Sequence, residues 1–436
     1  LVGMGSSGGL INLLTKRPDN IRETGLRVEQ RESLGLTADI GTADGSGQGW
    51  RLNASADRYR PYAMGADGEG AMVSLAMDQR LSGGDSLQVD VEIAHKSQIT
   101  QPGSQLLGGT TLAPINPETV LGLSSWSQPV TFDSIFAMAR LQRNLQSGWK
   151  MTATGSVHHV KTDDRSSFPW GCYAASGGNY YLVNNYFCSD GTYDLGDYRS
   201  TGEQRTMSSF SVDMSGSLVV MNRPMRTRVG AELFNYLSTK PEYFWVSAGN
   251  SGTPVDVFER DLWQSNLHTS LSTVVFQGEL MAGLRLASTH EGYRAAFPGY
   301  TPVPWNWTET SRAIPFLSYS RGGGFTAYRA DIEAGVVAPL SAPNNGTILP
   351  ARRIDSFEVG SKHRYESGLS TSAVLFYSER PYNFRNDTSL SDPAGSYIQR
   401  GTESRTGLEL SLSGALTKRT DAQISATLMT SDTSGT

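Results

Sequence analysis

Apolar and polar residues alternate one by one along many stretches of this chain of 436 residues. In residues 86–93 the even positions hold Ser, Gln, Asp and Glu, and the odd positions hold Leu, Val, Val and Ile. Strict alternation over about 4 to 8 residues indicates β-strands with one apolar and one polar face. We count about 17 strands of roughly 10 residues, the length that a tilted strand needs to cross a bilayer. Further examples are residues 51–57, 209–215, 279–286, 408–413 and 422–428.

The connections between these strands alternate between short and long. Short turns are predicted at Ser82–Asp85, Gln146–Gly148, Asn222–Pro224, Arg321–Gly324 and Glu366–Gly368. Long polar and aromatic loops are predicted over residues 97–133, 161–204, 238–260, 291–311 and 335–353. Structureless loops above about 12 to 15 residues are uncommon in compact domains. An antiparallel up-and-down sheet explains them, because its short turns share one rim and its long loops share the other.

The composition indicates which solvent each face meets. Charged residues make up 18% of the chain, against about 25% in an average soluble domain. No window of about 20 predominantly apolar residues is present, so no helical membrane span is expected. A sheet that crosses lipid must close on itself to satisfy its backbone. We therefore predict an all-β, transmembrane antiparallel β-barrel with apolar faces outward, a polar interior, and a lumen wide enough for a channel or a plug.

Residues 5–18 read G-S-S-G-G-L-I-N-L-L-T-K-R-P, directly before the first predicted strand. This segment resembles the end of the plug domain in TonB-dependent outer-membrane receptors, where glycines allow tight turns and the proline ends the plug. The resemblance implies a plug remnant over residues 1–18 and a partial barrel over residues 19–436. The residues that carry the plug-end motif are Gly5, Gly8, Gly9, Asn12, Thr15 and Lys16.

A second set of motifs extends the resemblance over most of the chain. Leu349-Pro350, Phe357–Lys362, Ala373–Tyr377, Gly401 and Gly407–Glu409 follow one another as they do in siderophore receptors of this family. The resemblance implies a 22-stranded barrel in the bacterial outer membrane that imports a ferric siderophore. It further implies energy coupling by the TonB–ExbB–ExbD complex. We expect the coupling box and most of the plug upstream of Leu1, and about five strands after Thr436, so that this chain is a fragment.

The long loops carry the candidate ligand contacts. Aromatic side chains offer large, rigid contact area, although several would instead form an aromatic girdle at the membrane interface. Arg165, Arg199 and Arg205 are candidates for binding an anionic chelate, or are simply solvated at the loop bases. No cluster of metal ligands occurs, so iron would arrive within its own chelator and no cofactor is expected. The aromatic candidates are Trp170, Tyr180, Tyr181, Tyr243, Trp245, Trp305 and Trp307.

The only two cysteines, Cys172 and Cys188, lie in one stretch rich in Tyr, Asn and Gly that lacks regular periodicity. Exposed free thiols are disfavoured, so we predict a loop disulfide rather than two unrelated thiols. Such a bond indicates an oxidising compartment.

Other functions find less support in the sequence. The net charge of −5 gives no electrostatic basis for binding nucleic acid. The glycine-rich start also matches nucleotide-binding and nucleophile-elbow patterns, but no helix follows it, so we expect no enzyme. Adjacent His158 and His159 point to opposite sides of a strand and cannot readily share a metal. Two alternatives remain: the same scaffold importing cobalamin, a carbohydrate or another bulky nutrient, and a passive porin or adhesive barrel.

Overall fold

A computed structural model describes residues 15–176, 179–220, 222–242, 246–247, 256–296, 302–339, 342–386, 394–417 and 420–435. The chain forms one large sheet of 18 strands and two small hairpins, β6–β7 and β10–β11. The strands are β1 (Ile21–Val28), β2 (Leu34–Ala43), β3 (Gly49–Tyr59), β4 (Gly68–Arg80), β5 (Ser86–Gln98), β6 (Leu106–Leu107), β7 (Thr111–Leu112), β8 (Val130–Asn144), β9 (Lys150–Trp170), β10 (Cys172–Ser176), β11 (Asn179–Asn184), β12 (Asp194–Val220), β13 (Arg223–Glu242), β14 (Val246–Ser247), β15 (Asp256–Val275), β16 (Gly278–Ala296), β17 (Val303–Arg321), β18 (Gly324–Glu333), β19 (Arg352–Arg364), β20 (Ser370–Arg385), β21 (Tyr397–Thr417) and β22 (Thr420–Ser434). Three short 3-10 turns are η1 (Gln30–Glu32), η2 (Ser82–Gly84) and η3 (Gln146–Gly148).

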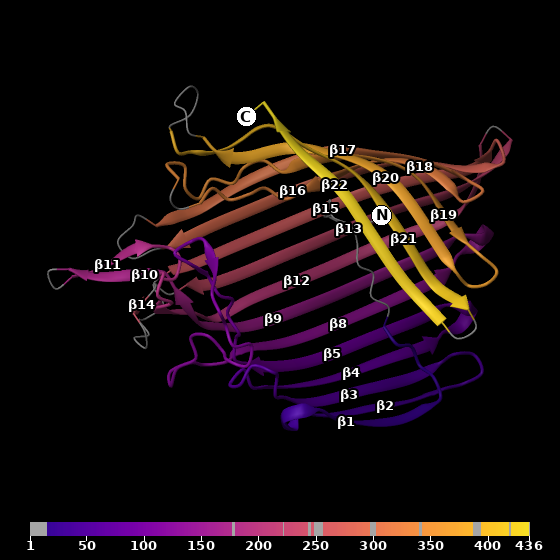
Figure 1. Cartoon of the computed structure of the whole chain (residues 1–436). Coiled ribbons are helices and arrows are strands. Elements are labelled where there is room, and N and C mark those ends of the chain that lie inside the picture. Colours follow the sequence, from indigo (N-terminus) through magenta and orange to yellow (C-terminus); the bar gives the residue numbers. More distant parts are fainter. Residues whose placement is uncertain are drawn as a thin grey trace.

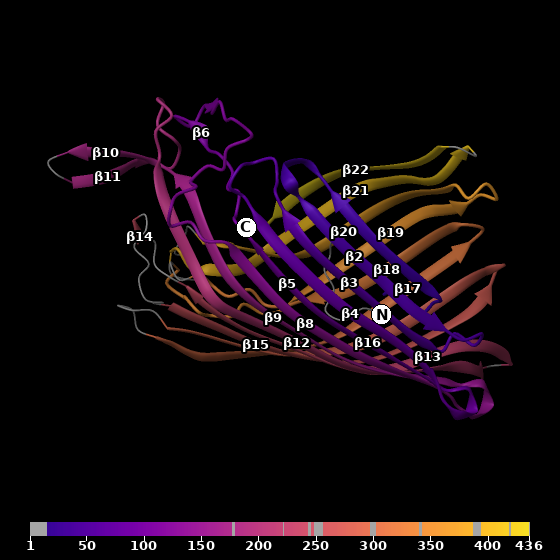
Figure 2. The same ribbon diagram turned by 90° about the horizontal axis from the view of Figure 1, so that it is seen from below.

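Each long strand of the sheet pairs antiparallel with the next one along the chain, as the up-and-down prediction requires. The sheet curves into a deep trough (Figures 1 and 2). Among the described residues no pairing joins β1 to β22, so the two edge strands do not close the sheet. Apart from the two-residue β14, the sheet has about the number of strands predicted.

The prediction of roughly ten residues per strand is wrong for the middle of the sheet. β9 has 21 residues, β12 has 27, and β13 and β15 have 20 each. The predicted loop over residues 161–204 is correspondingly shorter, because ladder pairing continues from Lys161 to Trp170 on β9. Alternation fades in these segments because both faces meet water or loops there, whereas backbone pairing needs no particular side chain.

The two rims differ as predicted. All five predicted short turns lie at one end of the strands, and every connection on this short-turn rim has five residues or fewer. The long loops lie on the other, long-loop rim, although its first two connections, residues 29–33 and 60–67, are also short. The predicted long loop over residues 291–311 is wrong: β16 ends at Ala296 and β17 begins at Val303, so only six residues connect them. At the tight turns, Ser147, Asn222 and Gln277 adopt positive φ values of 60°, 60° and 62°.

Strand β15 shows which side chains each face carries. Trp263, Leu267 and Leu271 are 50%, 60% and 41% exposed, whereas Gln264, Asn266 and His268 between them are 1%, 1% and 8% exposed. When the strand pairing is followed around the sheet, the buried polar side chains of Gln264, Asn266 and His268 lie on its concave, inner face. From Trp263 to Val275 the outer face spans about 28 Å, given a rise of about 3.3 Å per residue and a tilt near 45°. The apolar-out, polar-in arrangement expected of a barrel in lipid is therefore present.

Many polar side chains are buried among the described residues, including Gln264, Asn266 and Glu291. A small apolar cluster also lies on the inner face, where Tyr293 and Ala295 of β16 contact Ile348 of the β18–β19 connection. Among the described residues, no helix combines the length and apolar character of a membrane span.

Candidate functional site

Two clusters of charged side chains organise the inner face. The first, which we call the N-terminal clamp, ties the segment before β1 to strands β2–β5. Arg17 forms ion pairs with Asp78 of β4 and Asp90 of β5, and Asp90 is only 4% exposed. Thr15 lies beside it, since Arg17 Nη1 donates to Thr15 Oγ1 at 3.2 Å. One guanidinium thus bridges two carboxylates of the wall.

The other half of the clamp is centred on Asp39 of β2. Lys16 Nζ lies 2.8 Å from Asp39 Oδ2, and Arg51 of β3 donates to both oxygens of the same carboxylate at 2.8 Å. Arg51 also donates to the carbonyl oxygen of Arg17 at 3.2 Å. The clamp therefore comprises Lys16, Arg17, Asp39, Arg51, Asp78 and Asp90, and lies toward the short-turn rim. Of the predicted plug-end motif it includes Lys16, with Thr15 adjacent; Gly5, Gly8, Gly9 and Asn12 lie outside the described residues.

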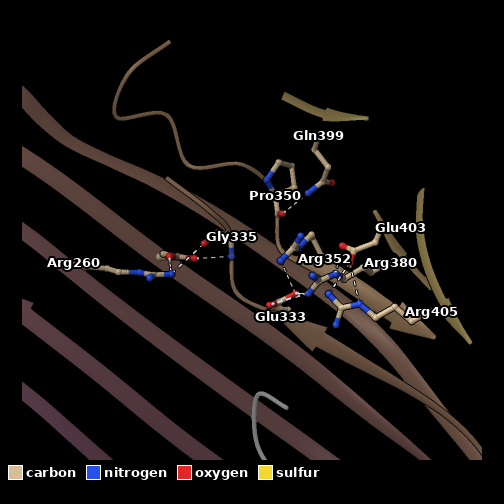
Figure 3. A network of polar contacts seen from close by, with 10 residues as sticks. Arg260, Glu333, Gly335, Pro350, Arg352, Arg380, Gln399, Glu403 and Arg405 are labelled. Atoms are coloured by element: carbon tan, nitrogen blue, oxygen red, sulfur yellow. Dashed lines mark hydrogen bonds and ion pairs between the residues drawn. The ribbon is translucent and has the colours of Figure 1, made fainter. Parts of the chain in front are cut away.

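The second cluster, the mouth network, lies at the long-loop ends of β18–β21 (Figure 3). Arg352 and Arg380 both donate to Glu333 Oε2, at 2.7 and 3.1 Å. Arg380 Nε donates to Glu403 Oε2 at 2.9 Å, and Arg405 Nη2 donates to Glu403 Oε1 at 2.6 Å. The charges alternate, with arginines at both ends, so the five side chains carry a net charge of +1.

Cations also line the inner face at the opposite rim. A hollow of about 710 Å³ there is bordered by Lys150, Arg226 and Arg228, with serines of β12 and β15 between them. Arg228 is paired with Asp213 at 2.7 Å, and Arg226 is mostly exposed, with Glu279 at 3.9 Å. Cationic side chains therefore occur along the inner face at both ends.

The long-loop rim carries a disulfide-closed hairpin. Cys172 and Cys188 are bonded, with a Cα–Cα distance of 4.7 Å, and the bond joins the base of the β10–β11 hairpin. The stretch without periodicity therefore contains two paired strands. Phe187 is buried against Tyr193, and its carbonyl accepts from Gly108 N at 2.9 Å, which joins the hairpin to the β6–β7 hairpin.

The predicted aromatic contacts fall in two different places. Trp170 packs edge-on against Tyr173 at the hairpin base, and Tyr181 is half exposed on β11. Trp305 and Trp307 stack on each other at 5.2 Å and lie on the outer face of β17. That position favours the aromatic-girdle alternative for this pair. The side chains of Tyr180, Tyr243 and Trp245 lie outside the described residues.

The three arginines proposed to hold an anionic chelate are each paired with a carboxylate two positions earlier. Arg165 lies 3.5 Å from Asp163, Arg199 lies 2.9 Å from Asp197, and Arg205 lies 2.8 Å from Glu203. Residues two apart on a strand share a face, so these pairs form within single strands. Their charges are locally balanced, which leaves the mouth network as the larger cationic cluster on the long-loop side.

Sequence reasoning did not identify the mouth network. Its members come from four strands and are separated by up to 72 positions, from Glu333 to Arg405, so only the pairing register brings them together. The predicted loop over residues 335–353 hid Arg352, which begins β19 and pairs in register with Glu333.

No protein-family model matches the chain, and neither does any curated protein sequence. Solved structures do match. The ferripyoverdine receptor of the outer membrane of Pseudomonas aeruginosa aligns over 100% of this chain and 59% of its own, with a TM-score of 0.78 and 15% identity. The ferric preacinetobactin receptor BauA from Acinetobacter baumannii aligns over 97% of this chain and 64% of its own, with a TM-score of 0.74 and 16% identity.

The ferric-catecholate import receptor Fiu from Escherichia coli K12, in its closed form, gives a TM-score of 0.73 at 13% identity, over 98% of this chain and 67% of its own. The chain has the fold of TonB-dependent siderophore receptors. It spans about three fifths to two thirds of the length of these solved receptors. The fold agrees with the family resemblance predicted from the sequence motifs. In this fold the mouth network and the clamp lie on the face of the wall that lines the lumen.

Proposed function

We propose that the chain forms most of the wall of a bacterial outer-membrane receptor that imports a ferric siderophore with energy from the TonB–ExbB–ExbD complex. The observation that carries the proposal is the inverted burial of a sheet with the siderophore-receptor fold. Leucines such as Leu267 face outward and are exposed, whereas Gln264 and Asn266 face inward and are buried. Lipid is the solvent that accommodates such an outer face.

The distribution of charge supports an anionic cargo. The mouth network has three arginines for two glutamates, and Lys150 lines the hollow at the short-turn rim, where Arg226 and Arg228 are paired with Glu279 and Asp213. Arginine pairs well with carboxylate and other oxygen anions because its planar group offers several donors in a fixed geometry. Iron in such a chelate would remain bound to its own ligands, so the wall needs to recognise only the outer surface of the chelate.

Energy coupling follows from the affinity that scavenging a scarce nutrient requires. A nanomolar site holds its ligand by about 12 kcal/mol, so spontaneous release is slow. One elementary charge that crosses an inner membrane at 100 mV supplies about 2.3 kcal/mol. Several charges per released cargo would therefore be needed, delivered by the coupling complex.

Growth on single iron sources tests the proposal. A strain lacking the complete gene should fail to grow on one ferric chelate as its only iron source, and the gene supplied in trans should restore growth. A protonophore should abolish uptake of that radiolabelled chelate and leave its binding to the cell surface intact. Growth on every ferric chelate without the gene would contradict a siderophore role.

The same assays separate the two alternatives. Energised uptake of radiolabelled cobalamin or oligosaccharide, and not of iron chelates, would indicate another nutrient on this scaffold. Steady ion conductance of the purified protein in planar bilayers, insensitive to coupling, would indicate a passive pore.

A further inference from the structure

The connection between β18 and β19 is described over residues 334–339 and 342–351, and these residues are folded against the inner face of the wall. It forms its own antiparallel bridge between Val337 and Ile348. Ala338 N donates to Thr347 O at 2.8 Å, and Leu349 N donates to Val336 O at 2.9 Å. Ala338, Ile348 and Leu349 are buried. We call the described residues of this connection, 334–339 and 342–351, the inner loop.

One end of the inner loop is fixed by a buried ion pair. Arg260 of β15 and Glu291 of β16 pair with each other, and Glu291 is 1% exposed. Gly335 lies between them: its N–H donates to Glu291 Oε2 at 3.1 Å, and its carbonyl accepts from Arg260 Nη2 at 3.1 Å (Figure 3). A side chain at position 335 would lie 2.2 Å from the carbonyl oxygen of Leu349, so this contact requires glycine.

The far end of the inner loop is attached to two other strands. Asn344 Nδ2 donates to the carbonyl of Tyr397 at 2.8 Å, and the N–H of Tyr397 donates back to Asn344 Oδ1 at 2.9 Å. Asn306 of β17 donates to the carbonyl of Gly346 at 3.2 Å. Gln399 of β21 donates to the carbonyl of Pro350 at 3.0 Å. The inner loop is thus bonded to β15, β16, β17 and β21.

These contacts run along the inner face of the wall from β15 to β21. The inner loop packs on the inner-face residues Tyr293 and Ala295 of β16 and reaches Tyr397 at the start of β21. The two residues that flank it, Glu333 and Arg352, are members of the mouth network. Moving the inner loop away from the wall would break bonds to four strands and leave the Glu291 and Arg260 charges without their backbone partners, at a cost that makes opening rare.

We propose that the inner loop is a fixed ledge inside the mouth, and that it sets the upper size of the cargo that can reach the mouth network. The inference deepens the proposed function and rests on it for the cargo. The ledge does not open during transport; cargo passes beside it, and movement belongs to other segments. Asn344, Glu291 and Arg260 are positioning residues that hold the ledge against the wall.

Hydrogen exchange of the full chain in detergent micelles tests the rigidity directly. The amides of Ala338, Gly346 and Leu349 should exchange at least about tenfold more slowly than those of residues 101–105, which lie outside every strand and turn. The N344A variant should accelerate exchange of the three amides about tenfold. The matched control N345A, at an exposed neighbour, should leave them unchanged. Exchange of the three amides in the unmodified chain as fast as in residues 101–105 would overturn the proposal.

A reversible lock tests whether the ledge must open. Cysteines at Ala295 and Ile348, whose side chains pack together, should form a bond on oxidation, verified by mass spectrometry. Uptake of the radiolabelled iron chelate that supports growth should be the same with the lock oxidised or reduced. Loss of uptake on oxidation, recovered on reduction, would show a mobile lid and refute the fixed ledge.

The size limit is tested with two ferric chelates of different bulk that both support growth. The N344A variant should raise uptake of the larger chelate relative to the smaller by about threefold over N345A. An unchanged ratio would refute the role in size selection. If no chelate is taken up by any variant, the proposed function fails, while the exchange experiment still decides whether the ledge is rigid.

Discussion

The N-terminal clamp and the mouth network are both ion-pair clusters on the inner face. The clamp joins a segment outside the sheet to the wall, whereas the network joins strands of the wall to one another. In the clamp, Lys16 and Arg17 come from a segment outside the sheet and meet carboxylates of the wall. In the mouth network, all five charges belong to β18–β21 themselves. The clamp is a tether between two parts of the chain, whereas the network links neighbouring strands.

This difference determines how each cluster responds to the loss of one residue. In the clamp, Arg17 is, among the residues that the structure describes, the one cation paired with Asp78 and Asp90. In the mouth network each glutamate has two arginines, so one partner remains after any single loss. The clamp can be released by moving the short segment that carries Lys16 and Arg17. The mouth network cannot be released in this way, because its ion pairs are shared among four strands.

Substitution R17A should have the largest effect. It leaves two wall carboxylates unpaired, one of them almost fully buried, and should lower the free energy of unfolding by about 3 kcal/mol. Urea unfolding in lipid vesicles measures the change. Substitution of the exposed Arg22 on β1, which has no described ion pair, is the control and should change little. Equal effects of R17A and R22A would show that the clamp contributes nothing.

Substitution R380A removes the centre of the mouth network. Glu333 and Glu403 each keep one arginine, so the expected loss is smaller, about 2 kcal/mol in the same unfolding assay. The control is R329A, at an exposed position of β18. A loss larger than that of R17A would contradict the view that shared partners buffer the network.

Substitution K16A tests the exposed half of the clamp. The Lys16 side chain is 60% exposed and Asp39 retains its two bonds from Arg51. The expected loss is therefore at most about 1 kcal/mol, and it should shrink as salt is added. A loss that persists at high salt would mean that Lys16 acts by packing.

Substitution R405A should have the smallest effect. Arg405 is the terminal, partly exposed arginine, and Glu403 keeps its bond from Arg380. Stability should fall by only about 0.5 kcal/mol. If uptake of the growth-supporting ferric chelate nevertheless falls in R405A and not in R329A, Arg405 contacts cargo; equal uptake in both variants would exclude that contact.

Much of the fold was predictable because its physical cause is local. A period of two needs only adjacent residues, and it located strands β3, β5, β12, β16, β21 and β22. The short turns were predictable because glycine and asparagine mark positions where φ must be positive, as at Gly83 and Asn222. Strand ends at the long-loop rim were not, because pairing there continues without an alternating pattern.

The candidate site was predicted only in part for a similar reason. Lys16 was identified from its motif, but its partner Asp39 lies on another strand, and nothing local marks it. Trp305 and Trp307 were predicted as ligand contacts in a long loop, whereas they lie on β17, and their outward direction depends on the pairing of β16 with β17. The inner loop looked like any other long polar loop, since its bonds to β16 and β21 join residues about 50 positions apart.

The sequence by itself determined the antiparallel strand pattern, the contrast between the two rims and the polarity of each face, because these depend on neighbouring residues and on solvent. Tertiary structure alone decided which charges meet on the inner face, and that residues 334–339 and 342–351 fold inward. Those outcomes depend on register and curvature, which bring together side chains from strands that are distant in the sequence.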